Sequence, residues 1–384
     1  MYPGNISILR TSIFSIPAII LSGLAWAAPV NDSQKLDSEV KNITESAILI
    51  DTHNDIPSFT VDGADIGNSP KNHTDIPRLR AGGVGAVFFS VYVAATYVNG
   101  NHSANRALQM IDTVYHDVLD RYPDTFTLAL TAHDIEEAHR EHKIAALMGL
   151  EGGHAIEDSP RLLRDYYRLG IRYMTLTHWN TNGWADSSGD INNRDVAHHN
   201  GLTQQGKDIV REMNRLGMMV DISHVADKTF YDALETSEAP LIASHSSCRA
   251  VTNAPRNMTD DMIRKLAAKG GVIQININCG FVSQKSADAP KDAPVRATLA
   301  DVVAHIDHAR QVGGIDAVGI GTDFDGITCT PEGLDDVSKF PNLTRALLEK
   351  GYSPNDVKKI YGENTLRLMR RVEKVAQEMQ QAHR

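Results

Sequence analysis

Histidine and carboxylate side chains stand at the ends of several short apolar runs in this sequence. The first run ends in His53 and Asp55, which are two positions apart. Residues with that spacing lie on one face of a strand, so both side chains can bind a single ion. Imidazole nitrogen and carboxylate oxygen suit Zn²⁺, and they do not exclude Mn²⁺, Co²⁺ or Fe²⁺. The pair therefore predicts half of a metal site.

Five further runs end in the same kinds of side chain, namely Glu151, His178, His224, His245 and Asp323. Taken singly, each is explained more readily as a hydrogen-bonded polar group at a strand end. Together, so many carboxylates and imidazoles in one cavity would be unfavourable unless a cation bound them. We therefore predict a centre rich enough for two ions, with Glu151 able to bridge them and Asp323 in reserve. Its expected ligands are His53, Asp55, Glu151, His224 and His245.

The elements that must position these residues are eight apolar runs, each followed by a longer amphipathic or polar stretch. Near-continuous apolar runs suit the strands of a parallel sheet that is buried on both faces. Strands that alternate with helices eight times predict a (β/α)8 barrel, in which the carboxyl ends of the strands carry the chemistry. The predicted strands are residues 47–53, 84–92, 144–152, 171–178, 217–224, 240–246, 271–277 and 317–324.

Two of the intervening segments carry clear helix signals. Residues 203–217 have apolar positions at helical spacing and end at Gly217, a residue suited to a left-handed helix end. Residues 353–372 open with Ser353 as a cap and Pro354 in the first turn. Both segments are predicted to be helices on the outside of the barrel.

Residues 28–384 are predicted to form one catalytic domain, because no low-complexity linker divides them. Two long polar segments, 56–83 and 179–203, each follow a predicted strand. Segments in that position lie at the mouth of such a barrel, so we expect both to border the active site.

Residues 1–27 have the three parts of a secretory signal: a basic residue, an apolar run and small residues at a cleavage point. The alternative is an uncleaved anchor helix, but the shortness of the run favours cleavage after Ala27. We expect export, to the periplasm in a bacterium and otherwise by secretion. No later segment is apolar enough to span a bilayer. The formal net charge of −10, without a densely basic stretch, argues against nucleic-acid binding.

The sequence resembles the membrane (renal) dipeptidase family of metallopeptidases, peptidase family M19, from about residue 47 to residue 370. The resemblance rests on many motifs in the family's order, among them IDTHNDIP, GLEGGHAIED, RYMTLTHWNTNGWADS, VDISHV, ASHSSCRAV, RNMTDD and GIGTDFDG. It implies an amidohydrolase-like barrel with two Zn²⁺ ions. His53 and Asp55 would bind one ion, His224 and His245 the other, and Glu151 would bridge both.

The resemblance also implies three residues that act on the substrate. His178 would stabilise the oxyanion that forms at the substrate carbonyl. Arg256 would pair with the terminal carboxylate of the substrate, and Asp323 would pass a proton from the attacking water to the leaving amine. From the residues alone, Arg256 is explained as readily by an ordinary surface arginine. Asp325 is the alternative to Asp323.

The implied activity is hydrolysis of dipeptides, including those with a D-residue at the second position, by a hydroxide that the two ions share. One alternative is a hydrolase with the same metals and another amide, ester, lactam or lactone substrate. Another is an exported binding protein with a vestigial site. Members of the family are often dimers, so a homodimer is expected as well.

The chain departs from the family's pattern at two points. It has Asn278 and Cys279 where other members carry an aromatic residue, so the resemblance does not define the substrate side-chain pocket. The cysteines that pair in mammalian members have no evident counterparts. Cys279 and Cys329 follow adjacent strands. We therefore hypothesise that they form a disulfide, which leaves Cys248 as the third cysteine.

Overall fold

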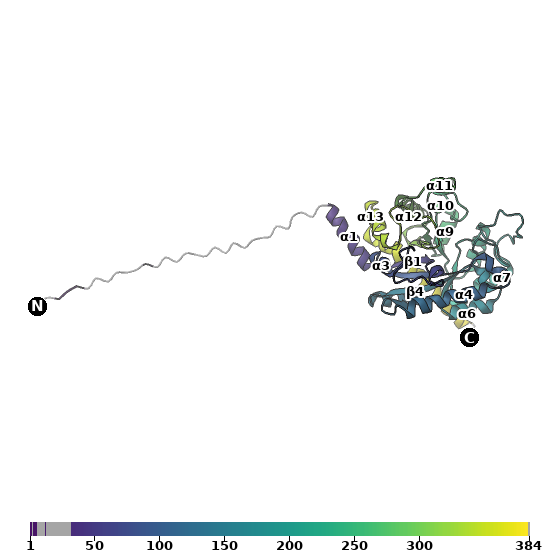
Figure 1. Ribbon diagram of the computed structural model, residues 1–384, viewed down its shortest axis with the longest axis horizontal. Coiled ribbons are helices and arrows are strands. Elements are labelled where there is room, and N and C mark those ends of the chain that lie inside the picture. The colour runs from purple at the N-terminus through teal and green to yellow at the C-terminus, as the bar shows by residue number, and fades with distance from the viewer. Residues whose placement is uncertain (2, 6–11, 13–31, 383–384) are drawn as a thin grey trace.

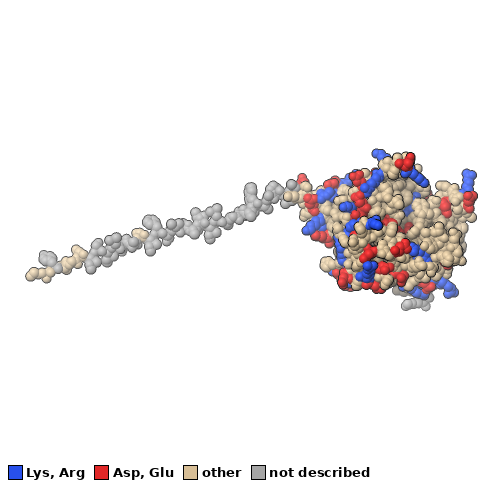
Figure 2. Space-filling model, in the orientation of Figure 1, with Lys and Arg blue, Asp and Glu red and all other residues tan. Residues whose placement is uncertain are grey.

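The structure is a computed structural model that describes residues 1, 3–5, 12 and 32–382. The predicted signal segment, residues 1–27, therefore lies almost wholly outside the described residues, and its cleavage stays a prediction. In the described part of the chain, no helix is both long and apolar enough to cross a membrane. The face seen in Figure 2 carries Lys and Arg side chains interspersed with Asp and Glu.

A parallel barrel forms the centre of the fold. Its strands follow one another around the ring in chain order, and they are β1 Leu49–Asn54, β2 Val84–Tyr92, β4 Ile144–Glu151, β5 Ile171–Thr175, β6 Met219–Asp221, β7 Ile242–Ser246, β8 Val272–Ile275 and β9 Val318–Ile320. The ring closes just beyond β9. There the Asp55 N–H donates to Phe324 O at 2.8 Å, and the Asp323 N–H donates to His53 O at 3.0 Å. The predicted (β/α)8 barrel is confirmed.

One strand was not predicted from the sequence. The short β3, Phe126–Leu128, pairs in parallel with β4 outside the ring, with Phe126 opposite Ile144. Three residues are too few to show an alternating or continuous apolar pattern, so the sequence carries no periodic signal for this strand.

Helices surround the strands, as Figure 1 shows. In chain order they are α1 Asp32–Ser46, α2 Pro57–Thr60, α3 Ile76–Ala81, α4 Ser103–Thr113, α5 Ala132–Arg140, α6 Pro160–Arg168, α7 Gln204–Leu216, α8 Asp227–Thr236, α9 Asp260–Ala268, α10 Cys279–Val282, α11 Gln284–Ala287, α12 Leu299–Gly313, α13 Phe340–Glu349, α14 Pro354–Lys358 and α15 Asn364–Ala382. The helices between successive strands give each parallel pair its crossover connection.

The two helices predicted from end signals are present. Helix α7 is capped by the Thr203 side chain and ends at Gly217, whose φ of 88° lies in the left-handed region that favours glycine. At α14 the hydroxyl of Ser353 accepts from the Asp356 N–H, as predicted for a cap. The predicted single helix differs in its course, because a π-helical turn over Lys359–Glu363 separates α14 from α15.

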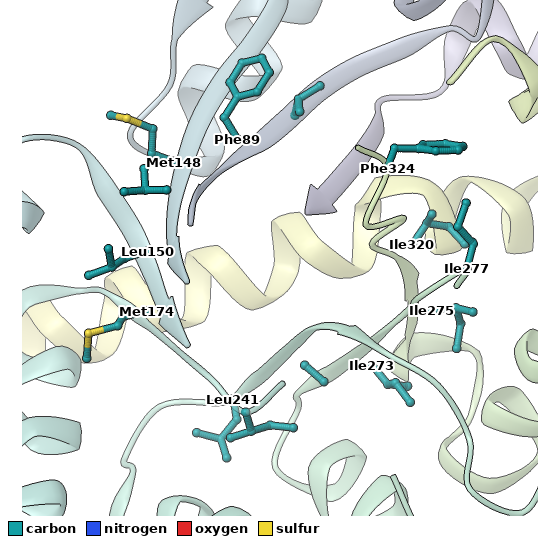
Figure 3. Packing of buried hydrophobic residues seen from close by; sticks show 14 of the residues in the cluster. Phe89, Met148, Leu150, Met174, Leu241, Ile273, Ile275, Ile277, Ile320 and Phe324 are labelled. Carbon is teal, nitrogen blue, oxygen red and sulfur yellow. The ribbon is translucent and has the colours of Figure 1, made fainter. Parts of the chain in front are cut away.

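The apolar core has two parts, because neighbouring residues of a strand face opposite sides of the sheet. Phe88 belongs to the cluster inside the barrel, together with Tyr173, whereas Phe89 belongs to the layer between strands and helices. Figure 3 shows part of that outer layer, in which Phe89 of β2 and Met148 of β4 extend from their strands. Buried polar side chains also occur within the strands, Gln274 of β8 among them, and not only at the ends of the ring.

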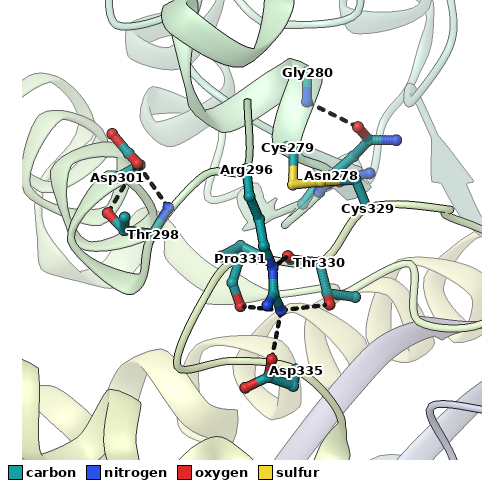
Figure 4. Close-up of a disulfide and its surroundings, with 11 residues drawn as sticks. Asn278, Cys279, Gly280, Arg296, Thr298, Asp301, Cys329, Thr330, Pro331 and Asp335 are labelled. Atoms are coloured by element: carbon teal, nitrogen blue, oxygen red, sulfur yellow. Dashed lines mark hydrogen bonds and ion pairs between the residues drawn. A yellow bond between two sulfur atoms is a disulfide. The ribbon is translucent and has the colours of Figure 1, made fainter. Parts of the chain in front are cut away.

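The hypothesised disulfide is present between Cys279 at the start of α10 and Cys329 in the loop after β9 (Figure 4). Their Cα atoms lie 5.5 Å apart, and the Cys279 N–H donates to Cys329 O at 3.2 Å. The pair closes a loop of 50 residues in sequence. Cys248 is free and buried.

Replacing Cys279 and Cys329 together with serine should lower the free energy of unfolding by about 4 kcal/mol, because the open chain regains the entropy of a 50-residue loop. The measurement is the midpoint of chemical unfolding, compared with that of the parent protein with and without reductant. Before reduction, the denatured parent protein should have one titratable thiol and the reduced protein three. Three thiols before reduction would contradict the pairing.

His305 of α12 is a fully buried histidine that joins three segments. Its Nδ1 accepts from the Cys248 N–H at 2.9 Å, and its Nε2–H donates to Val282 O at 3.1 Å. Protonation of Nδ1 would break this bond, because the new N–H would point at the N–H of Cys248. Burial lowers the pKa of His305 to about 4, so the ring is neutral near neutral pH.

In the unfolded chain this histidine has an ordinary pKa near 6.5. Between pH 6.5 and pH 4 the unfolded chain therefore binds a proton at His305 that the folded protein does not bind. Stability should therefore fall as the pH drops from 6.5 towards 4, with this histidine accounting for about 2 kcal/mol of the loss at pH 5. Urea unfolding at pH 7.5 and pH 5 measures the loss. In His305→Asn, the fall in the free energy of unfolding between pH 7.5 and pH 5 should be smaller than in the parent protein by about 2 kcal/mol. The exposed His133→Asn serves as the control, and an equal loss in both variants would refute the assignment.

Candidate metal centre

The five predicted metal ligands meet at the carboxyl ends of the barrel strands. The distance from His53 Nε2 to Asp55 Oδ2 is 3.3 Å, and from His53 Nε2 to Glu151 Oε2 it is 3.5 Å. On the other side of Glu151, its Oε1 lies 3.2 Å from His224 Nε2 and 3.3 Å from His245 Nε2. Each carboxylate oxygen of Glu151 therefore faces a different group of ligands, which is the arrangement that a bridging ligand requires.

Burial and charge suit a cation at this place. Each of the five residues is at most 5% exposed, so bulk water cannot solvate the charge of any of them. His53 Nε2 and Asp55 Oδ2 face each other without the alignment of a hydrogen bond, and neither has another hydrogen-bond partner in the described chain. The Nε2 atoms of His224 and His245 also converge, at a hydrogen-bond distance of 3.0 Å. Imidazole nitrogens and carboxylate oxygens that gather in this way fit a metal.

Three of the five residues already have the ionisation state of a metal ligand. Burial opposes the charge on Glu151, but the nearby imidazoles, above all His53 and His178, hold its pKa well below the ordinary value. Burial lowers the pKa of both His224 and His245 well below the ordinary range, which leaves their rings neutral. Ionised carboxylates and neutral imidazoles are the forms that bind divalent metals. Burial opposes the charge on His53, but the neighbouring phenol and carboxylates raise its pKa well above the ordinary value, so this ring would release a proton when a metal binds.

His178 and Asp323 lie beside this cluster. His178 Nε2 is 3.8 Å from Glu151 Oε1, and burial lowers the pKa of this histidine, so the ring is neutral. Burial, and then the charge of Asp55, raise the pKa of Asp323 well above the ordinary carboxyl value. The Nδ2 of Asn276 donates to Asp323 Oδ2 at 2.8 Å and fixes the direction of the carboxyl. Both groups border the cavity described below.

Arg256 is not a surface residue. It is 5% exposed, and its guanidinium donates to His245 O at 3.0 Å and to Ser246 Oγ at 3.2 Å. The ring of Phe281 lies 5.5 Å from the guanidinium carbon. Burial lowers the pKa of Arg256 to about 10, so the side chain stays charged at neutral pH. Its burial rules out the surface alternative. Nearby carboxylates, Asp323 above all, supply anionic charge beside the guanidinium, and its predicted role towards the substrate stays a prediction.

Asp325, the alternative to Asp323, is bound to the segment after β1. Its Oδ1 accepts from the His73 N–H at 2.7 Å, and its own N–H donates to His73 Nδ1 at 3.0 Å. These two bonds bring residues 56–83 to the mouth of the barrel, as predicted. Residues 179–203 lie there too, because the Ser188 N–H donates to His224 O at 2.8 Å.

A cavity of about 290 Å³ opens directly above the predicted ligands. It is lined by Asp55, Ser58, Phe59, Tyr92, Glu151, His178, Trp179, His224, Asn278, Phe281, Asp323, Asp325, Gly326 and Ile327. Sequence analysis missed the aromatic and apolar members of this wall. Tyr92 and Trp179 each had a signal, because they stand at the end of an apolar run or directly after one. Ile327 had none, and Phe281 lies in the segment after the seventh predicted strand, where sequence analysis found no match for the aromatic residue of other members.

A barrel that gathers buried imidazoles and carboxylates at its strand ends, under a small polar cavity, has the form of a metal-dependent hydrolase. The sequence profile of the membrane dipeptidase family, peptidase family M19, matches residues 37–383. The chain therefore belongs to this family of metallopeptidases, and it is a hydrolase of the dipeptidase type. The resemblance found in the sequence motifs is confirmed.

Similar proteins agree with this assignment. Dipeptidase verJ of Clonostachys rogersoniana is 43% identical over 349 residues, which cover 87% of this chain and 86% of that protein. An uncharacterized dipeptidase of Schizosaccharomyces pombe is 38% identical over 389 residues, covering 97% and 92% of the two chains. A metallo peptidase structure from Rhodobacter sphaeroides, liganded with a phosphinate mimic of L-Ala-D-Ala, is 26% identical with a TM-score of 0.75, and covers 85% of this chain and 100% of that one.

Proposed function

We propose that the protein is a zinc dipeptidase with two ions per chain, and that Glu151 bridges them. The observation that carries the proposal is the position of the Glu151 carboxylate, whose Oε2 faces His53 while its Oε1 faces His224 and His245. His53 and Asp55 would hold one ion, and the other two histidines would hold the second. Bound zinc supplies Lewis-acid polarisation of the carbonyl and lowers the pKa of water to near neutrality.

The remaining residues would divide the work on the peptide bond. The neutral His178 can donate a hydrogen bond to the substrate carbonyl oxygen, where negative charge develops. Asp323 would accept a proton from the attacking water and give it to the leaving amine. The raised pKa of its carboxyl suits a group that must both take and release a proton, and Asn276 keeps it oriented.

Arg256 would select substrates that end in a free carboxylate. Its charge is buried beside His245, and a carboxylate can accept from the fork of N–H groups that a guanidinium presents. A cavity of about 290 Å³ has room for a small peptide but not for a long one. The phosphinate mimic of L-Ala-D-Ala in the Rhodobacter sphaeroides structure supports hydrolysis of dipeptides with a D-residue at the second position.

The experiment is hydrolysis of a panel of L,L and L,D dipeptides by the protein as expressed, after chelation and again after zinc is restored. Cleavage that disappears with the chelator and returns with zinc supports the proposal. If the zinc-loaded protein cleaves an ester, lactam or lactone and no dipeptide, the second candidate function replaces it. Folded protein that binds zinc and turns over none of these substrates would favour a binding role.

Two further parts of the proposal concern the context of the enzyme. We propose that the protein is exported, on the basis of the signal-like residues 1–27. We also propose that it forms a homodimer, because members of the family are often dimers. Mass determination of the secreted or periplasmic protein tests the first, with cleavage after Ala27 as the expected result. Light scattering of the purified protein tests the second, and a monomer at micromolar concentration would contradict it.

A further inference from the structure

We propose that the hydroxyls of Tyr173 and Ser244 are positioning residues, one for each metal, which hold His53 and His245 in the tautomer that offers Nε2 to the ion. This inference rests on the proposed function, since it assumes two bound ions. Neither hydroxyl reaches the cavity or the substrate. Both act through the far nitrogen of a histidine that faces Glu151.

Tyr173 lies in β5 and is fully buried inside the barrel. Its hydroxyl is 2.7 Å from His53 Nδ1 and donates to Thr52 O at 3.1 Å. A phenol has a single proton. When that proton goes to the carbonyl oxygen, the phenol oxygen must accept from His53 Nδ1–H. The Nε2 of the same ring then carries the lone pair, and this is the nitrogen that faces Asp55 and Glu151.

Ser244 forms the corresponding arrangement beside the second group of ligands. Its hydroxyl donates to Asp221 Oδ2 at 2.6 Å and lies 2.8 Å from His245 Nδ1. A carboxylate oxygen accepts only, so the serine proton is committed to Asp221 and the serine oxygen accepts from His245 Nδ1–H. Asp221 is itself held by the backbone N–H groups of Ser223 and Ser244, at 3.0 and 2.8 Å.

Space for the ring of Tyr173 inside the barrel depends on Gly149 of β4. Gly149 is the partner of Tyr173 in the neighbouring strand, and a Cβ atom built there would lie 1.9 Å from the ring. A residue with any side chain at this position would push the phenol away from His53. The ring thus fills a space that the glycine of β4 leaves open, which accounts for the fit of a tyrosine among the apolar side chains inside the barrel.

The physical effect is on metal affinity. A metal binds an imidazole nitrogen that has no proton, so the other tautomer of His53 or His245 must first rearrange. Hydrogen bonds that fix the tautomer and the ring direction of a metal-binding histidine usually change metal affinity ten- to hundredfold. We expect a loss of this size for each hydroxyl that is removed.

The test compares Tyr173→Phe and Ser244→Ala, singly and together, with matched controls. Tyr166→Phe removes a buried phenol that donates to Ala155 O at 3.1 Å, and Ser247→Ala removes a buried serine hydroxyl that donates to Asn276 O at 2.9 Å. The readout is the pair of stepwise Zn²⁺ dissociation constants, measured by competition with a chromogenic chelator. Thermal unfolding of the metal-free proteins is measured in parallel.

Each single variant should weaken one of the two steps by ten- to a hundredfold, and the double variant should weaken both. The controls should keep both constants within threefold of the parent protein while losing similar thermal stability, which separates positioning from structure. Constants for Tyr173→Phe and Ser244→Ala that match their controls would overturn the inference and leave the proposed function intact. A parent protein that binds no Zn²⁺ would overturn both.

Discussion

Replacing Glu151 with glutamine is expected to lower kcat/KM for dipeptides by about a thousandfold and to weaken the binding of both zinc ions. The two carboxylate oxygens face different ligand groups, at 3.2 Å from His224 Nε2 and 3.5 Å from His53 Nε2. Glutamine keeps the size of the side chain, but it turns one of these oxygens into an N–H donor. A donor directed at either ligand group cannot bind a cation, so the bridge is lost in whichever way the amide turns.

The measurements are steady-state hydrolysis of a dipeptide at saturating zinc and the zinc content after dialysis. Glu157→Gln is the matched control, because Glu157 is exposed and lies in the turn that follows the same strand. Its activity should stay within twofold of the parent protein. If Glu151→Gln retained two tightly bound ions, the bridging role would be wrong even if activity fell.

Replacing Arg256 with lysine should lower kcat/KM about a hundredfold for dipeptides with a free carboxylate, a loss of about 3 kcal/mol. Lysine keeps the charge but loses the fork of N–H groups that can meet both carboxylate oxygens. The lysine side chain has a single amino group, so His245 O and Ser246 Oγ would also lose their present donors. The part of the loss that comes from the missing fork should fall on recognition of the substrate's terminal carboxylate.

Dipeptide amides separate this effect from general damage. They lack the carboxylate, so the variant and the parent protein should cleave them at similarly low rates. Arg249→Lys is the control: Arg249 is a partly buried arginine whose guanidinium pairs with Asp227 at 2.7 Å. An equal loss on dipeptides and on their amides would show that Arg256 supports the fold of the site instead of binding the carboxylate.

The ligands of the proposed metal centre could be found from the sequence because of one property of the fold. Parallel strands end at the same edge of the ring, so residues as distant as His53 and Asp323 need only stand at a strand end to come together. The disulfide between Cys279 and Cys329 followed from the same reasoning, since the two cysteines follow neighbouring strands. The roles of His178, Arg256 and Asp323 were given by the family resemblance, not by spacing.

What could not be predicted depends on contacts that no local pattern encodes. Tyr173 stands in mid-strand and resembles an ordinary core residue, yet its hydroxyl lies 2.7 Å from a residue 120 positions away. Asn276 stands within an apolar run, and its bond to Asp323 joins the segments that follow two neighbouring strands. The burial of Arg256 was equally hidden, because the sequence of a loop does not tell how deeply it folds back over the barrel.

Three of the residues at the mouth of the barrel have a backbone that is unfavourable for their type. His224, Asp323 and Asp325 have φ values of 66°, 66° and 68°, in the left-handed region where glycine is at ease and other residues lose on the order of 1 kcal/mol. Asp325 has a structural reason to be there, because its carboxylate accepts from the His73 N–H and so holds the segment after β1. His224 and Asp323 are retained by their proposed roles in the reaction. A lineage that no longer needed hydrolysis would gain stability from glycine at positions 224 and 323, so these two positions should be among the first to change in an inactive lineage.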